Sequence, residues 1–386
     1  MNRKDNRNAV LGDLYQFQYG TGNTIEDIGG DYPIYGSNGA VGFTNIYNSE
    51  DAPVIGHIGA YAGIVNWASG KHFVTYNGVI CKIKDGVNPK FGYYSLLNSG
   101  LQKRLRGSTQ PFVSYDLLDE VKTYLPDKKI QDNIAKTLSE IDAKIELNNK
   151  INSELEQMVK TIYDYWFVQF DFPNKNGKSY KANKGKMVWS EELKREIPDG
   201  WEIKHLKDIF EFEKGIEPGS SEYLNFPEND NCIKFFRVGD IEGESSIYID
   251  STNKKYTKVE EKDVVVTFDG SVGKIGLGLN GAISGGLRKI YDKSKKYNNS
   301  LVYFIFRDER IIATIHKYAT GSILLHASSS IDYLKIPFEK SVYLKFQEIT
   351  TSFFDQIVKN KRENFKLVEL RDWLLPMLMN GQVVVK

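Results

Sequence analysis

The chain has 386 residues, of which 41% are hydrophobic and 26% charged, so it is long enough for two domains and has the composition of a globular protein. Its formal net charge of +1 argues against a lone nucleic-acid binder, which normally carries a basic excess, but leaves room for local basic patches. The two cysteines lie far apart, which argues against a disulfide scaffold. No apolar run approaches 18 residues, which argues against a membrane span, and the polar first segment argues against a signal peptide. We therefore expect a cytoplasmic location.

Residues 1–125 are expected to form a β-rich module. Short runs of β-branched and aromatic residues are separated by glycine, as in HFVTYNGVICKI at 72–83, which is typical of strands. An amphipathic helix is expected near 92–106, because Gly107 follows where glycine commonly ends a helix. A polar turn then leads to the end of the module.

Residues 126–173 are expected to form one long helix. Apolar positions step by four and three residues, which is the spacing of a heptad seam. Two consecutive seam positions are occupied by amides instead. The full seam is Ile134, Leu138, Ile141, Ile145, Asn148, Asn152, Leu155, Val159, Ile162 and Trp166.

Residues 174–196 begin with NKNGKSYKANKGK, which has five lysines and no acidic residue. This composition is typical of a solvated linker that contacts phosphates at most in passing.

Residues 197–386 repeat the order of the first half, with a β-rich module at 197–337 and a second long helix at 338–386. VLGDLYQFQYG at 10–20 resembles HLKDIFEFEKG at 205–215, so that Gly20 corresponds to Gly215. LRGSTQPFVS at 105–114 resembles YATGSILLHAS at 318–328. DVVVTF at 263–268 reads as a strand and 300–319 as a helix. Matches in the same order indicate a duplicated module.

The second helix also carries two amides in its seam, Asn360 and Asn364. Polar seam residues cost stability but fix the alignment of paired helices. If the two helices pair antiparallel, Asn148 and Asn152 can face Asn360 and Asn364; the alternative is that this stretch is exposed. The predicted fold class is therefore α+β, with two pseudo-symmetric modules whose long helices form an antiparallel coiled coil.

Several stretches resemble the conserved regions of specificity (S) subunits of Type I restriction-modification systems, the HsdS family. They are GDYPIYGSNGAVGF (30–43), LPDKKIQDNIAKTLSEIDAKIELNN (125–149), YWFVQFDFP (165–173), IPDGWEIKHLKDIFEF (197–212) and LRDWLLPMLMNGQV (370–383). The second helix departs from this pattern, because Leu344 aligns with Gln131 and Arg371 interrupts the apolar seam.

The resemblance implies two target-recognition domains, residues 1–125 and 197–337, each reading one half of a split site in double-stranded DNA. The helices at 126–173 and 338–386 would set the spacer between the half-sites and dock two methyltransferase (M) subunits, which restriction (R) subunits would join. The partners would use S-adenosylmethionine, and ATP with Mg²⁺ for restriction, so this chain needs no cofactor or metal of its own.

Base edges are read by Arg, Lys, Asn and Gln, and phosphates by these residues together with Ser, Thr and backbone N–H groups. Candidates in the first module are Tyr35, Ser37, Asn38, Lys103, Arg104, Arg106, Ser108, Thr109 and Gln110. Candidates in the second module are Arg237, Ser271, Lys274, Arg288, Lys289, Ser322 and His326. Ordinary turns and solvated faces use the same residue types, so both interpretations stay open.

Two other functions fit parts of the sequence. Pro126-Asp127 with Asp142-Ala143-Lys144 fits the loose spacing of a Mg²⁺-dependent nuclease of the PD-(D/E)xK type. Residues two apart on a helix point to different faces, however, so Asp142 and Lys144 would not converge. The other alternative is a coiled-coil adaptor whose β-rich modules bind protein or sugar. The five histidines lack metal-ligand spacing, and we expect no catalytic residue.

Overall fold

The computed structural model describes residues 6–22, 26–107, 109–243, 245–252, 255–322 and 325–383. It divides into two units, Met1–Lys144 with Leu367–Lys386, and Ile145–Lys366. Each unit holds one β-rich module and a stretch of both long helices, so each is described by itself.

Module 1 runs from β1 to β8 and is built around a six-stranded sheet. The strand order is β2-β7-β5-β6-β3-β4, in which β3 and β6 are parallel, and β1 pairs antiparallel with β8 beside the sheet. The elements are β1 (Asn6–Val10), α1 (Leu11–Leu14), β2 (Tyr15–Tyr19), β3 (Tyr32–Gly36), β4 (Gly39–Thr44), β5 (Ser49–Gly56), β6 (Val65–Val74), β7 (Gly78–Ile83), α2 (Pro89–Asn98), η1 (Leu101–Arg104), α3 (Tyr115–Glu120) and β8 (Lys122–Leu125).

Module 2 runs from β11 to β20 and contains two four-stranded sheets, β12-β19-β16-β17 and β14-β13-β18-β15. Its elements are β11 (Glu202–His205), α5 (Leu206–Ile209), β12 (Glu211–Lys214), η3 (Ser220–Glu222), β13 (Cys232–Phe236), η4 (Val238–Asp240), β14 (Tyr248–Asp250), β15 (Lys258–Val259), β16 (Val264–Thr267), β17 (Ile275–Gly276), β18 (Gly281–Ile283), β19 (Leu287–Tyr291), α6 (Asn299–Ile305), α7 (Glu309–Lys317), η5 (Ser328–Tyr333) and β20 (Lys335–Phe338).

The two modules share one topology, which confirms the predicted duplication. β2-β7-β5 in module 1 corresponds to β12-β19-β16 in module 2, and the first and last strands pair antiparallel in both. The parallel pair β3–β6 corresponds to β13–β18. The single long strand β6 is replaced by β17 and β18, so the one sheet of module 1 becomes two in module 2.

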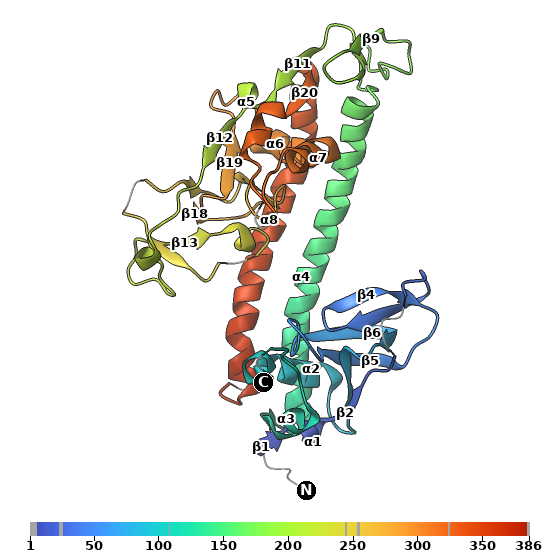
Figure 1. The fold of residues 1–386 in the computed structure, drawn as a ribbon, viewed down its shortest axis with the longest axis vertical. Helices are drawn as coiled ribbons and strands as arrows, with labels where there is room; N and C mark the ends of the chain where they lie inside the picture. Colours follow the sequence, from blue (N-terminus) through green and yellow to red (C-terminus); the bar gives the residue numbers. More distant parts are fainter. Residues whose placement is uncertain are drawn as a thin grey trace. The chain divides into compact units, whose positions relative to one another are not determined.

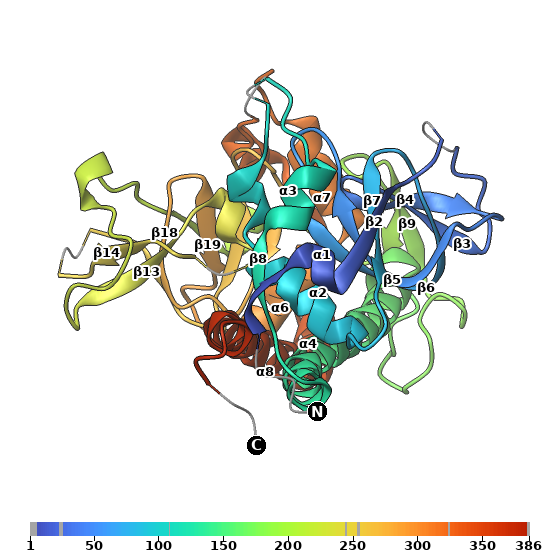
Figure 2. The same cartoon turned by 90° about the horizontal axis from the view of Figure 1, so that it is seen from below.

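Two long helices follow the modules, α4 (Lys128–Tyr163) and α8 (Lys340–Met379). Within each unit their segments run antiparallel, and Figure 2 views them nearly end-on. This confirms the predicted helix pair (Figure 1). α4 ends in a π-helical turn at Asp164–Val168.

The lysine-rich segment after α4 leads to a hairpin of β9 (Met187–Ser190) and β10 (Arg195–Pro198). Tyr180 stacks on Phe172 with 4.8 Å between ring centroids, so this segment is anchored by an aromatic contact. Its lysines are exposed, and Lys186 pairs with Asp199 at 2.9 Å.

The shorter helices end earlier than the sequence pattern predicts. α2 stops at Asn98, because Gly100 adopts a left-handed conformation with φ of 64°. The predicted helix at 300–319 is split in two, because Asp308 accepts a hydrogen bond from Arg310 N and so caps a new helix. Gly107 and Gly321 therefore do not end helices.

Each module packs its core onto the long helices of its own unit. In module 1, Leu11, Phe91 and Leu118 cluster with Ile134 and Leu138 of α4. In module 2, a larger aromatic cluster joins Phe268, Tyr303, Phe304 and Phe306 to residues of both helices, including Tyr163, Phe167, Tyr343 and Phe346. Among the described residues, no helix combines the length and the apolar character that crossing a membrane requires.

Candidate nucleic-acid interface

A loop and a hairpin from distant parts of the chain meet in module 1. The loop is 57–63, which follows β5, and the hairpin is the segment closed by the bridge between Arg106 and Phe112, of which residues 106–107 and 109–112 are described. Val113 N donates to His57 O and Gly59 N donates to Pro111 O, both at 2.9 Å. Ile58 and Phe112 form a β-bridge between the two segments.

Module 2 repeats this arrangement, with the loop at 268–274 and a hairpin closed by the bridge between Thr320 and His326; residues 323 and 324 lie outside the described part of the chain. Ala327 N donates to Phe268 O at 2.7 Å, and Gly270 N donates to Leu325 O at 2.8 Å. Asp269 and His326 form the bridge that Ile58 and Phe112 form in module 1. The structure thus brings each of the two similar stretches, 105–114 and 318–328, against a loop that is distant from it in the sequence.

Glycine is required at one equivalent position in each module, because two backbone segments approach closely there. A Cβ atom on Gly20 would lie 2.1 Å from Thr75 O, and one on Gly215 would lie 2.1 Å from Ser284 O. Both glycine N–H groups are also hydrogen-bonded to the neighbouring strand segment, Gly20 to Gly78 O and Gly215 to Leu287 O. The sequence match between these glycines therefore reflects the same close approach of two backbones.

Most predicted contact residues of module 1 lie near its loop and hairpin. Asn38, Lys103, Arg104, Arg106, Thr109 and Gln110 are exposed, and Arg106 lies 3.9 Å from Asp116. Ser108 lies outside the described residues. Ser37 is half-buried, and its hydroxyl lies within hydrogen-bonding distance of Ile58 O and Asn77 O. Tyr35 is half-buried with its ring edge-on to His72.

The predicted contact residues of module 2 separate into exposed and buried groups. Ser271, Lys274, Arg237, Ser322 and His326 are exposed; Lys274 pairs with Glu242, and Arg237 pairs with Asp240. Lys289 is mostly buried and pairs with Asp263 at 2.6 Å.

Arg288 is only 5% exposed, so its guanidinium does not reach the surface. It donates to Gly285 O, Leu287 O and Ser328 Oγ, and burial lowers its pKa. The arginine holds β19 to the start of η5, and as placed it has no access to DNA.

An aromatic group that no short sequence pattern indicates lies beside the loop of module 1. Tyr19 stacks between His57 and Tyr115, with centroid distances of 4.3 Å and 4.0 Å, and Tyr76 lies edge-on to His57. The rings come from four separate segments, so only the fold brings them together. The Tyr76 side chain is half-exposed at the edge of the group.

The four seam asparagines are buried, which removes the alternative of an exposed stretch. Asn148 Nδ2 donates to Asn364 Oδ1 at 2.9 Å, and Asn360 Nδ2 donates to Asn152 Oδ1 at 2.8 Å. Asn364 Nδ2 donates in turn to Asn149 Oδ1 at 2.8 Å. Asn148 Oδ1 is buried and has no hydrogen-bond partner among the described residues.

The same capping contact anchors each module on a long helix. In module 1, Asn88 caps α2 and its N–H donates to Gln131 Oε1 at 2.9 Å. In module 2, Asn298 caps α6 and its N–H donates to Gln347 Oε1 at 2.7 Å. The sequence alignment of Leu344 with Gln131 is therefore wrong, because Gln347 makes the equivalent contact one turn later.

Asp142 is engaged by neighbouring side chains. Its carboxylate accepts from the Tyr94 hydroxyl at 2.6 Å and from Arg371 Nη1 at 3.1 Å. Arg371, which interrupts the predicted seam, thereby forms an ion pair between the helices. Across the described part of the chain, no group of three or more His, Cys, Asp or Glu residues could hold a metal ion.

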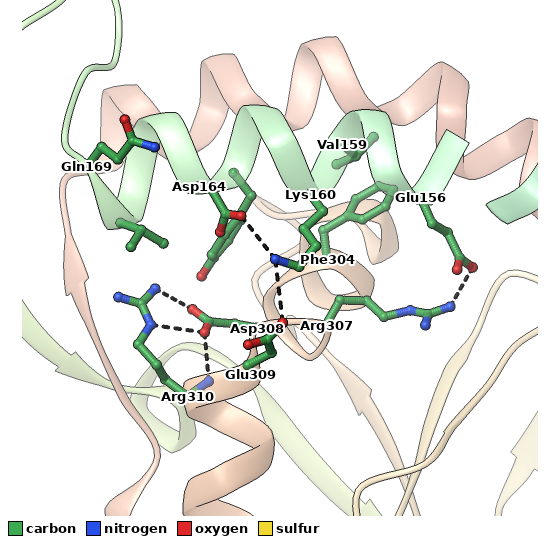
Figure 3. Close-up of a pocket in the computed structure, with 12 residues that line it drawn as sticks. Glu156, Val159, Lys160, Asp164, Gln169, Phe304, Arg307, Asp308, Glu309 and Arg310 are labelled. Atoms are coloured by element: carbon green, nitrogen blue, oxygen red, sulfur yellow. Dashed lines mark hydrogen bonds and ion pairs between the residues drawn. The ribbon is translucent and has the colours of Figure 1, made fainter. Parts of the chain in front are cut away.

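A cavity of about 320 Å³ lies between the end of α4 and the connection from α6 to α7 (Figure 3). Its charged side chains pair with one another: Lys160 contacts Asp164 and Glu309, Arg307 contacts Glu156, and Arg310 contacts Asp308. Because every charged side chain of the lining has an oppositely charged partner within it, with Lys160 shared by two carboxylates, the cavity fits a joint between helix and module better than a ligand site.

The chain matches known proteins over most of its length. Residues 8–157 and 198–364 match the family model described as the Type I restriction modification DNA specificity domain. The chain is 28% identical over 324 residues to the Type I restriction enzyme MjaIX specificity subunit of Methanocaldococcus jannaschii, covering 78% of this chain and 71% of that protein. It is 22% identical over 339 residues to the HindI specificity subunit of Haemophilus influenzae, covering 72% of each.

The crystal structure of a Type I restriction-modification system S subunit from M. genitalium has the same fold. Its TM-score is 0.57, with 98% of this chain and 97% of that chain covered at 17% sequence identity. The two stretches that match the family model each contain one β-rich module and part of its long helix. The chain belongs to the family of Type I restriction-modification specificity subunits.

Proposed function

We propose that this chain is the DNA-sequence-specificity subunit of a Type I restriction-modification complex. Each module reads one half of a bipartite site in double-stranded DNA, and the chain performs no chemistry of its own. The observation that carries this proposal is the repeated loop-and-hairpin arrangement. It presents exposed polar side chains in both modules: Arg106, Thr109 and Gln110 in module 1, and Ser271, Lys274, Ser322 and His326 in module 2. These side-chain types hydrogen-bond to base edges and phosphates.

The paired helices set the spacer between the two half-sites in this proposal. α4 has 36 residues, which at about 1.5 Å per residue gives a length of about 54 Å. At about 3.4 Å per base pair this length corresponds to roughly 16 base pairs. The buried asparagine pairs support the proposal, because a shifted alignment would bury their amides against apolar side chains.

The chain acts with methyltransferase subunits, and we propose that two M subunits dock on the helices and that R subunits join them. S-adenosylmethionine, ATP and Mg²⁺ then belong to the partners. We further propose a cytoplasmic location, where the free thiols of Cys81 and Cys232 stay reduced.

The test is single-molecule methylome sequencing of a host that expresses the chain with its methyltransferase subunits. The expected result is one bipartite motif, and replacing residues 1–125 by the matching module of another family member changes one half-site only. Methylation without a defined motif would contradict the proposal and favour the alternative that the chain is a coiled-coil adaptor whose modules bind protein or sugar. Cleavage of plasmid DNA by the purified chain with Mg²⁺, lost in Asp142→Ala, would favour the nuclease, which nothing in the comparisons supports.

A further inference from the structure

The β-bridge between loop and hairpin carries different residue pairs in the two modules. Module 1 uses Ile58 and Phe112, which are both half-buried. Module 2 uses Asp269 and His326, whose side chains are 22% and 57% exposed. The apolar pair shows that the backbone arrangement does not require a polar pair, so the Asp–His pair needs another explanation.

Stability does not supply that explanation. The imidazole Nδ1 of His326 lies 2.8 Å from Asp269 Oδ1, and the side chain is more than half exposed. Exposed pairs of this kind contribute little to folding, because water screens the charges and the side chains lose conformational freedom.

The geometry instead orients the ring. A carboxylate only accepts hydrogen bonds, so Asp269 fixes the proton on Nδ1 and leaves Nε2 as the free ring atom. Within the described residues, the ring hydrogen bond of His326 is the one that Nδ1 makes to Asp269. The hairpin backbone is held at the same time, because Thr320 and His326 exchange hydrogen bonds of 2.9 Å and 2.7 Å.

Asp269 is itself held in place. Its N–H donates to Gly286 O at 3.2 Å, and the residue directly before it, Phe268, is buried in the core. The Arg288 guanidinium is buried nearby, and Asp269 raises its pKa against the lowering effect of burial. The pair is thus a preset hydrogen-bonding group on a rigid base, with Ser271 and Ser322 exposed on the same two segments.

We infer that His326, oriented by Asp269, is a DNA-contacting residue of module 2 and binds the DNA through Nε2. The inference rests on the proposed function. The shared chemistry is one hydrogen bond at the imidazole Nε2. In the neutral ring Nε2 accepts from an amino group on a base edge, and in the ring that carries both protons Nε2–H donates to a phosphate oxygen or to a base acceptor. A base contact makes His326 a determinant of the second half-site, and a phosphate contact makes it a determinant of affinity alone.

The test uses the complete complex with its methyltransferase subunits and the variants His326→Phe, Asp269→Asn and the double variant Asp269→Ile with His326→Phe. The double variant installs the pair that module 1 already folds with, so loss of folding does not confuse the result. Duplex binding at several salt concentrations and methylome sequencing are measured for each variant. His316→Ala, an exposed histidine of α7, is the matched control.

We expect the double variant and His326→Phe to bind about tenfold more weakly, with the first half-site unchanged. Relaxed sequence preference at one position of the second half-site identifies a base contact, and uniform weakening with a smaller salt dependence identifies a phosphate contact. Binding and motif equal to the wild type in both variants would overturn the inference. If the wild-type complex itself methylates no bipartite motif, the proposed function fails instead.

Discussion

Asn148 and Asn364 lie 216 residues apart in the sequence, yet the side-chain amide of Asn148 donates to the oxygen of Asn364 at 2.9 Å. Both side chains are buried between α4 and α8. Replacing Asn148 alone by Leu would remove the donor to the buried Asn364 oxygen. We expect Asn148→Leu to lower the free energy of unfolding of the helix pair by about 1–3 kcal/mol, measured by chemical denaturation.

The double variant Asn148→Leu with Asn364→Leu is the control for this prediction. Replacing both partners removes the unsatisfied amide, so the double variant should regain most of the lost stability. A single variant as stable as the double variant would show that the amide pair has no energetic role.

The proposed role of the helices in setting the spacer between the half-sites predicts the effect of an insertion. Four residues added after Asn149 in α4, together with four added after Lys361 in α8 so that both asparagine pairs are kept, lengthen the helix pair by about 6 Å and rotate the remainder of each helix by about 40°. The added length equals nearly two base-pair steps along the DNA axis, and the added rotation is close to the twist of one base-pair step. We expect the methylated motif to keep both half-sites while its spacer grows by one or two base pairs. Methylome sequencing checks this, and altered half-sites with the original spacer would refute it.

The repeated glycines predict a defect confined to one module. In Gly215→Ala the new methyl group would meet Ser284 O at 2.1 Å, so the backbone of module 2 must shift. We expect a loss on the order of 3 kcal/mol in the stability of module 2, seen as faster proteolysis of that module. Recognition of its half-site should fail with it.

Gly239→Ala is the matched control, because no atom lies within 4 Å of its added Cβ and it belongs to the same module. Gly20→Ala should produce the corresponding defect in module 1. Equal protease resistance of Gly215→Ala and Gly239→Ala would contradict the steric argument.

Module 1 is expected to lose stability in mild acid because of His72. The side chain is fully buried, its Nδ1 lies 2.9 Å from Gly70 O, and Nε2 has no partner among the described residues. Burial lowers the pKa of His72 below the ordinary value of 6.5, so protonation favours the unfolded chain. The stability it contributes is complete above pH 6.5 and is lost as the pH falls below that value.

The measurement is thermal unfolding of the wild type, His72→Gln and the exposed-site control His316→Gln at pH 7.5 and pH 5.5. We expect His72→Gln to lose less stability than the wild type between pH 7.5 and pH 5.5, and His316→Gln to lose as much as the wild type. Equal acid responses of the wild type and His72→Gln would exclude His72 as the sensitive group.

Features that repeat along the chain could be predicted from the sequence. The seam spacing predicts both long helices, and the matched asparagines predict which residues face one another. The strand-rich modules and their common order follow from repeated patterns such as the one ending at Gly20 and Gly215. Each of these signals lies within a short window or in two aligned copies of it.

Long-range packing could not be predicted in the same way. Arg288 and Lys289 look like a basic surface cluster in the sequence, but the buried Arg288 guanidinium donates to Gly285 O and Ser328 Oγ. The partner of His326 is 57 residues away, and the role of Gln347 depends on a contact with Asn298. A single sequence lists these residue types without saying which of them become neighbours.

The pairing of β1 with β8, and of β11 with β20, means that the chain enters and leaves each module through two adjacent strands. A foreign recognition module with the same paired ends and an equivalent helix cap could be inserted between them as a cassette, because Gln131 and Gln347 lie on the long helices outside the exchanged segment. Genetic recombination within the two paired end strands could therefore give a host new target sites in one event. Point mutation would have to change the contact residues of a module one at a time.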